Sequence, residues 1–128
     1  MDDERAAEFA EGWYAAWNAH DLEAILEHYA EDVEMASPLV AALAGRDDGR
    51  IVGKVALRDY FAAGLERYPD LHFEPLGLFA GVESLVLHYV SVGGRPAAET
   101  VFLDEHDRIT RYSAHYGVVG PEYGNVGG

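Results

Sequence analysis

An imidazole and a carboxyl group lie on two neighbouring stretches of alternating sequence, and together they could move a proton. His88 lies in SLVLHYVSV and Glu99 in AAETVFL, on either side of Gly93-Gly94. If these glycines form a two-residue hairpin turn, Val92 pairs with Arg95 and His88 lies opposite Glu99 on one side of the sheet. A glutamate beside a histidine can fix the imidazole tautomer or raise its pKa, so the two groups are candidate catalytic residues for proton transfer.

The same pairing leaves a structural alternative open. It places Val86 opposite Val101 and Val90 opposite Ala97, so the two polar side chains have apolar companions on an interior face. There they could simply satisfy one another as a buried polar pair. The pairing assigns to the outer face of the sheet Tyr89, Ser91, Ala98, Thr100 and Phe102.

The last alternating stretch, 108–116, offers further candidates for the same interior. Tyr112, Ala114 and Tyr116 point to one side, and Arg111, Ser113 and His115 point to the other. A shift of one residue in the pairing would exchange the two sets. His72 and His115 lie on strands whose facing the sequence does not fix, and no histidine pair has the HExxH spacing of a zinc helix. We therefore expect neither a metal nor a cofactor.

Helical periodicity predicts the elements that position these groups. Phe9, Trp13 and Trp17 form an aromatic stripe along the first helix. This helix is predicted to end near Asn18. Asp21 caps a second helix, which closes before Asp32. A third helix runs from Lys54 to Tyr68 and ends at Pro69-Asp70. The apolar stripes of the second and third helices comprise Leu22, Ile25, Leu26 and Tyr29, and Leu57, Tyr60, Phe61, Gly64, Leu65 and Tyr68.

Strand-like alternation predicts the sheet. Val33 to Ser37 alternates as a half-buried strand that Pro38 stops, and residues 39–53 are expected to form a loop. After the third helix, short turns separate further strands, which makes the sheet mainly antiparallel. These later strands are predicted at 71–80, 84–92, 97–103 and 108–116. Helices followed by strands indicate an α+β fold in which three N-terminal helices cover one face of a curved sheet and leave a pocket.

Composition limits the classes of partner. The 128 residues, 49% of them hydrophobic, suit one domain covering 1–128, with 117–128 as a loose glycine-rich tail. A net charge of −14 argues against nucleic acid and against anionic membrane surfaces, which require basic patches. The chain contains no cysteine, and its acidic N-terminus differs from a signal peptide. We expect a cytoplasmic protein.

Three long segments carry a resemblance to a known family. WNAHDLEAILEHYAEDVEMASP, GKVALRDYFAAGLERYPDLHFEPL and GGRPAAETVFLDEHDRITRYSAHYG resemble the SnoaL-like branch of the nuclear transport factor 2-like (NTF2-like) superfamily over nearly the whole chain. The resemblance implies a cone-shaped α+β fold and a homodimer formed through the outer face of the sheet, with Tyr89 and Phe102 in the contact. It implies no single activity, because this superfamily includes isomerases, cyclases, dehydratases, epoxide hydrolases and proteins without known chemistry.

The ketosteroid isomerases of this superfamily use an aspartate base, a tyrosine and a protonated aspartate. Matching motifs implies Ser37 at the position of the base, Trp13 at that of the tyrosine and Glu99 at that of the protonated acid. Only Glu99 retains a suitable group, because serine is a poor base and an indole is a weaker donor. Burial could keep Glu99 neutral as a hydrogen-bond donor.

Two functions are therefore open. The first is an isomerase, cyclase or dehydratase acting through His88 and Glu99 on a small hydrophobic or aromatic metabolite, with Tyr112 or Tyr116 donating hydrogen bonds. The second is a ligand-binding or dimerisation module without catalysis. In both, the candidate substrate-binding residues are Trp13, Trp17, Tyr29, Met35, Ser37, Tyr60, Phe61, Leu65, Val101, Tyr112, Ala114 and Tyr116.

Overall fold

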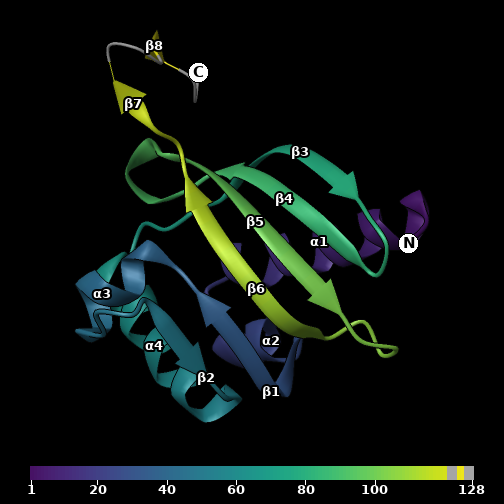
Figure 1. The fold of residues 1–128 in the computed structure, drawn as a ribbon, viewed down its shortest axis with the longest axis horizontal. Helices are drawn as coiled ribbons and strands as arrows, with labels where there is room; N and C mark the ends of the chain where they lie inside the picture. The colour runs from purple at the N-terminus through teal and green to yellow at the C-terminus, as the bar shows by residue number, and fades with distance from the viewer. Residues whose placement is uncertain (121–123, 126–128) are drawn as a thin grey trace.

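Helices and strands alternate in the first half of the chain, and strands dominate the second half (Figure 1). The computed structural model describes residues 1–120 and 124–125. Its elements are α1 (Asp3–Asn18), α2 (Leu22–Leu26), β1 (Tyr29–Ala36), α3 (Pro38–Ala44), β2 (Arg50–Val52), α4 (Lys54–Arg67), β3 (Glu74–Ala80), β4 (Ser84–Val90), the 3-10 turn η1 (Val92–Gly94), β5 (Pro96–Leu103), β6 (Ile109–Tyr116), β7 (Val119–Gly120) and β8 (Gly124–Asn125).

Within the described part of the chain, six strands form one curved sheet in the order β2-β1-β6-β5-β4-β3. All neighbouring strands in it are antiparallel except β1 and β6, which run parallel. In Figure 1, α1, α2 and α4 lie behind this sheet, on its concave side. The predicted α+β layout, with helices over one face of a curved and mainly antiparallel sheet, is confirmed.

The core lies between the helices and the concave face. On β4 and β5 alternate residues point inward, which buries Leu85 and Leu87 on one strand and Val101 and Leu103 on the next. From α1 comes Trp13, which is 1% exposed and is among the largest fully buried side chains. Because Glu99 lies in the inward-facing row of β5, its carboxyl group is buried in the interior.

The structure departs from prediction between residues 21 and 53. Helix α2 has only 5 residues, and Tyr29 begins β1 instead of extending the helix. The predicted loop contains α3 and β2, so four α-helices are present in the described residues instead of three. Pro38 does end the strand, but it also begins α3, where a fixed φ and a missing N–H suit the first turn. The Ser37 side chain caps that helix by accepting from Leu39 N at 3.2 Å.

The connection between β4 and β5 also differs from prediction. The last ladder pair is Val90 with Pro96, and Ser91 N donates to Arg95 O at 2.7 Å, so the loop spans residues 91–95 instead of the two glycines alone. Gly93 and Gly94 both have positive φ (70° and 74°), a left-handed conformation that glycine adopts at little cost and that lets the chain reverse direction there. The predicted register is therefore wrong by one residue, and the two faces of β4 exchange relative to β5.

The segment after β6 falls only partly within the described residues. Val119–Gly120 pairs with Gly124–Asn125 as the antiparallel strands β7 and β8. The prediction of a loose tail over 117–128 includes residues 121–123 and 126–128, which lie outside the described part of the chain.

Candidate functional site

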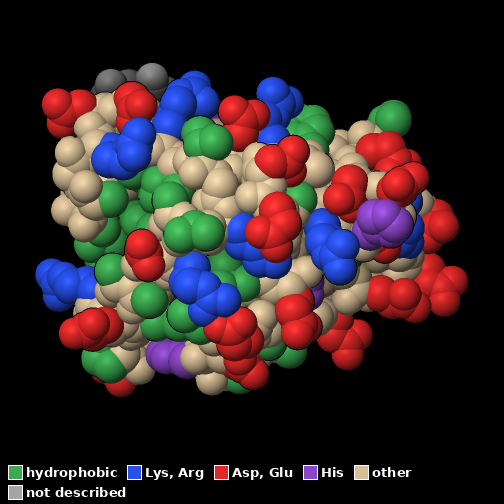
Figure 2. Space-filling model, turned by 90° about the horizontal axis from the view of Figure 1, so that it is seen from below, with side chains coloured by type: hydrophobic (Ala, Val, Ile, Leu, Met, Phe, Trp, Pro, Cys, Tyr) green, Lys and Arg blue, Asp and Glu red, His purple; other side chains and the backbone are tan. Residues whose placement is uncertain are grey.

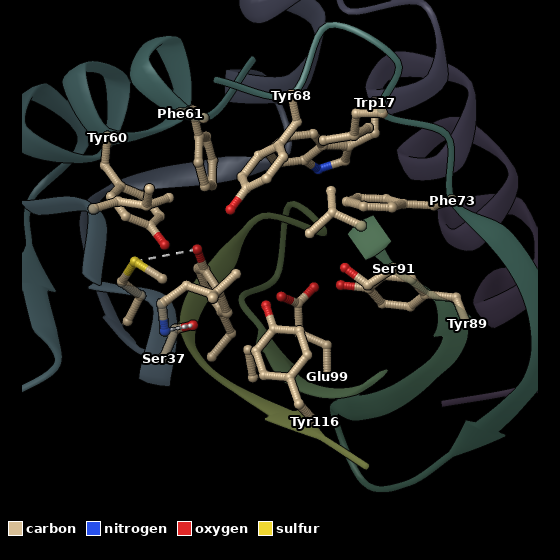
Figure 3. Close-up of a pocket in the computed structure, with 18 of the residues that line it drawn as sticks. Trp17, Ser37, Tyr60, Phe61, Tyr68, Phe73, Tyr89, Ser91, Glu99 and Tyr116 are labelled. Carbon is tan, nitrogen blue, oxygen red and sulfur yellow. Dashed lines mark hydrogen bonds between the residues drawn. The ribbon is translucent and has the colours of Figure 1, made fainter. Parts of the chain in front are cut away.

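A pocket lies between the concave face of the sheet and helices α1, α3 and α4 (Figure 3). Its volume is about 70 Å³, and its surface is mostly apolar. This volume is well below the roughly 300–1,000 Å³ of typical ligand pockets, so the hollow admits a small group and leaves the rest of a larger ligand at the mouth. It is lined by Trp13, Trp17, Met35, Ser37, Leu39, Leu43, Tyr60, Phe61, Gly64, Tyr68, Leu71, Phe73, Tyr89, Ser91, Val92, Glu99, Tyr112, Ala114 and Tyr116.

Glu99 is the one carboxyl group among these lining residues. It projects inward from β5, opposite Leu87 on β4 and Ala114 on β6. The residue is 7% exposed, and its Oε2 has no hydrogen-bond partner among the described residues. Burial raises the pKa of Glu99 to about 8, because the charged form loses its solvation. At neutral pH the carboxyl group is therefore mostly protonated and can donate.

Tyrosine hydroxyl groups surround this acid. Figure 3 shows the Tyr116 hydroxyl beside the Glu99 carboxyl, with Tyr89 and Ser91 on its other side. Burial, followed by the charge of Glu99, raises the pKa of both Tyr89 and Tyr116 above the usual range. Burial also raises the pKa of Tyr60 to about 12, although the Ser37 hydroxyl partly opposes this. These phenols stay protonated at physiological pH, so they are hydrogen-bond donors.

Two other polar groups near the pocket are already engaged. Tyr112 donates from its hydroxyl to Met35 Sδ at 3.3 Å, the contact drawn as a dashed line in Figure 3. Trp13 Nε1 donates to the Tyr29 hydroxyl at 3.0 Å. Trp17 Nε1 is buried without a hydrogen-bond partner in the described residues. Burial raises the pKa of Tyr29 above its usual range, and the indoles of Trp13 and Trp17 oppose this in part, but the hydrogen bond to the hydroxyl comes from Trp13.

Residues 10–115 match the family model of the SnoaL-like domain. The chain belongs to this family. A SnoaL-like protein of unknown function from Burkholderia thailandensis is 41% identical, with a TM-score of 0.88, over 92% of this chain and 98% of that one. The predicted membership of the SnoaL-like branch of the NTF2-like superfamily is thus confirmed. None of the curated proteins matches this sequence.

More distant structures share the fold of this SnoaL-like domain. A proposed isomerase of the SnoaL-like family from Agrobacterium tumefaciens is 16% identical, with a TM-score of 0.71, over 90% of this chain and 99% of that one. The epoxide hydrolase/cyclase-like enzyme SalBIII, which has a role in pyran ring formation in the polyether salinomycin, is 19% identical with a TM-score of 0.70. That match covers 91% of this chain and 94% of SalBIII.

His88 does not meet Glu99 in this SnoaL-like domain. It pairs with Ala98, while Glu99 pairs with Leu87, so the imidazole lies on the outer face of the sheet. A Cβ added to Gly77 on β3 would lie 3.6 Å from His88 Nδ1, which places the ring over that neighbouring strand. The prediction of a histidine–glutamate pair is wrong, because the β4–β5 loop is longer than the assumed two-residue turn.

Most of the other predicted binding residues do line the pocket of the SnoaL-like domain, and three do not. Tyr29 lies behind the wall, where it receives the Trp13 hydrogen bond. Val101 is fully buried in the core, and Leu65 packs against the core from α4. The predicted residues that line the pocket are Trp13, Trp17, Met35, Ser37, Tyr60, Phe61, Tyr112, Ala114 and Tyr116.

Sequence reasoning missed several lining residues. The two-residue turn predicts Tyr89 and Ser91 on the outer face, but the actual register turns both inward beside Glu99. Leu39 and Leu43 line the pocket from α3, and their spacing of four was the available sign of a helix in the supposed loop. Phe73 lies just before β3 and stacks on Trp13, with ring centroids 5.7 Å apart.

Two further observations concern the described part of the SnoaL-like domain only. No helix there combines the length and the hydropathy needed to cross a bilayer. No three histidine or acidic side chains lie together there in a way that could hold a metal ion.

Proposed function

We propose that this SnoaL-like domain is an enzyme of the isomerase, cyclase or dehydratase type, in which Glu99 acts as a general acid on a small hydrophobic substrate that carries oxygen. The observation that carries the proposal is the buried Glu99 carboxyl, which is mostly protonated at neutral pH and has a free Oε2 in the pocket. A buried acid with a pKa near the working pH can both donate and accept a proton.

The proposed step conserves protons. The O–H bond of the Glu99 carboxyl breaks, and its proton forms a bond to a carbonyl, hydroxyl or ether oxygen of the substrate. The electron pair stays on the carboxylate, and positive charge passes to the substrate. The carboxylate then takes a proton back as the rearranged, cyclised or dehydrated product forms. Tyr116, beside the acid, orients the substrate oxygen by donating a hydrogen bond.

Two of the proteins with a similar structure have names that agree with this class of chemistry. One is a proposed isomerase, and SalBIII is an epoxide hydrolase/cyclase-like enzyme with a role in pyran ring formation. Both are too distant in sequence to fix an activity here. The apolar walls support a hydrophobic ligand, and the hydroxyl groups of Tyr60, Tyr89, Tyr116 and Ser91 support one that carries oxygen.

Turnover of a panel of β-hydroxyketones and hydroxy-epoxides, followed by mass spectrometry, tests the general acid. Glu99→Gln should lose activity at least a hundredfold, because an amide cannot give up a proton. The matched control is His88→Gln, on the outer face, which should stay within about twofold of wild type. Wild-type turnover should fall above about pH 8, where Glu99 loses its proton. An active Glu99→Gln variant, or an inactive His88→Gln variant, would contradict the proposal.

We also propose that the protein is a cytoplasmic homodimer formed through the outer face of the sheet. Phe102 is 36% exposed there beneath the guanidinium of Arg111, which lies 4.5 Å from its ring centroid, and Phe79 is 60% exposed. Light scattering should give twice the monomer mass for the wild type and the monomer mass for Phe102→Glu. Val82→Glu, at an 89% exposed turn position, should stay dimeric. A monomeric wild type would refute this assembly.

A further inference from the structure

The described residues that line the pocket include no lysine, arginine or histidine. Their one acidic group is Glu99, and the rest are apolar, aromatic or hydroxyl-bearing. The pocket is therefore neutral when Glu99 is protonated and negative when it is ionised. Arg95 does not line the pocket, although its guanidinium lies 5.0 Å from the ring centroid of Tyr116. An anionic ligand would find no cation among the lining residues, and it would meet the carboxylate instead.

Aromatic rings make up much of the wall around this acid. Trp17, Phe61, Tyr68 and Phe73 lie along the helix side of the pocket, and Tyr89 and Tyr116 lie along the sheet side (Figure 3). The faces of such rings carry partial negative charge, and they attract cations most strongly where water is excluded. Proteins hold quaternary ammonium groups in cages of aromatic rings. In this pocket one acid, Glu99, lies among such rings.

The electrostatic potential of the whole molecule is negative, as is that of the pocket when Glu99 is ionised. The chain carries a net charge of −14. Figure 2 shows acidic side chains gathered toward the end of the molecule at which α1 begins. Such a field raises the local concentration of cations and repels anions at low ionic strength.

We infer that this pocket binds small organic cations, of the alkylammonium class, more tightly than neutral molecules of the same shape. The inference deepens the proposed function and rests on it, because a substrate that has accepted a proton from Glu99 is itself a cation next to a carboxylate. A stable quaternary ammonium ion reproduces that charge without reacting. It would contact the aromatic walls and the partnerless Oε2 of Glu99.

Binding should depend on pH through Glu99. A bound cation favours the carboxylate, so affinity rises as pH increases through about 8. The other titratable groups whose pKa responds to Glu99 are phenols, and burial keeps each of them protonated in this range. They come from α1, β1, α4, β4 and β6, and they are Tyr14, Tyr29, Tyr60, Tyr89, Tyr112 and Tyr116.

Choline and its neutral carbon analogue 3,3-dimethylbutan-1-ol provide the test. The two tryptophans of the chain, Trp13 and Trp17, both line the pocket, so intrinsic fluorescence reports directly on its occupancy. At pH 8.5, choline should bind at least tenfold more tightly than the alcohol, and this ratio should shrink at pH 6. Glu99→Gln should reduce the ratio and remove its pH dependence.

Glu8→Gln is the matched control, because it removes the same charge from an exposed position on α1. It should leave the preference for choline and its pH dependence as in the wild type. Equal or tighter binding of the alcohol, or no binding of choline, overturns the inference. This outcome is independent of turnover: a protein that prefers the alcohol but still needs Glu99 for catalysis keeps the proposed general acid and loses only the cation site.

Discussion

The wild-type protein is expected to lose stability as pH rises from about 5 to about 9, and the Glu99→Gln variant is expected not to show this loss. Burial raises the pKa of Glu99 to about 8 in the folded state, from an ordinary value of 4.5. Between these values the folded protein holds a proton that the unfolded chain releases, so the free energy of unfolding falls as pH rises. The full difference is roughly 5 kcal/mol, which is large beside the stability of a small domain.

Urea denaturation at pH 5, 7 and 9 measures this effect as the difference between the wild type and Glu99→Gln. The free energy of unfolding of the variant should increase relative to that of the wild type as pH rises, because an amide has no charged form to bury. The exposed control Glu8→Gln should follow the wild-type curve at every pH. Parallel curves for wild type and Glu99→Gln would mean that water solvates the carboxylate, and the argument for a protonated acid in the pocket would fail.

A second large effect is expected from truncation of Trp13. This side chain is 1% exposed, packs against Trp17, Phe73 and Tyr89, and donates its hydrogen bond to Tyr29 at 3.0 Å. Trp13→Ala should lower the free energy of unfolding by about 3–5 kcal/mol, because it opens a cavity among these rings and removes the donor. Chemical denaturation at pH 6, where Glu99 is protonated, measures this cost without the contribution of the acid.

Trp13→Phe separates packing from the hydrogen bond. It keeps a ring in the core but leaves the buried Tyr29 hydroxyl without its donor, which should cost about 2 kcal/mol. Adding Tyr29→Phe should cost less in this background than in the wild type, because the two residues share one interaction. Additive losses would show that the hydrogen bond between Trp13 and Tyr29 contributes little.

Much of the fold could be predicted because its elements have strong periodicity. The aromatic stripe of α1 and the apolar spacing of α4 required little beyond i, i+3 and i+4 patterns. Helix α1 ends at Asn18 as predicted, and α4 begins at Lys54 and ends one residue before the predicted Tyr68. The region after β1 was harder. Its alanines and glycines carry a weak periodic signal, and Pro38 is compatible both with the end of a strand and with the first turn of a helix.

The candidate site was less accessible to sequence reasoning because it depends on register. Glu99 could be recognised as an acid in an otherwise apolar inward row with Ala97, Val101 and Leu103. Its neighbours could not be fixed, because the glycine pair permits both a two-residue turn and the observed loop of residues 91–95. A two-residue turn places His88 inward and Tyr89 outward, the reverse of the observed register. The choice depends on tertiary packing, since Val92 turns toward the pocket instead of extending the strand.

The register that the β4–β5 loop sets therefore decides which side chains reach the cavity. With the chain unchanged in length, a two-residue turn at Gly93-Gly94 would present His88 to the interior. Deleting one of residues 92–94 would instead allow a two-residue turn between Ser91 and Arg95 in the present register, with Leu87 still opposite Glu99. Insertions and deletions at hairpin tips are among the changes that folded domains tolerate best. A slip of one residue between these two strands would therefore exchange the groups that face the cavity, without a single substitution in its wall.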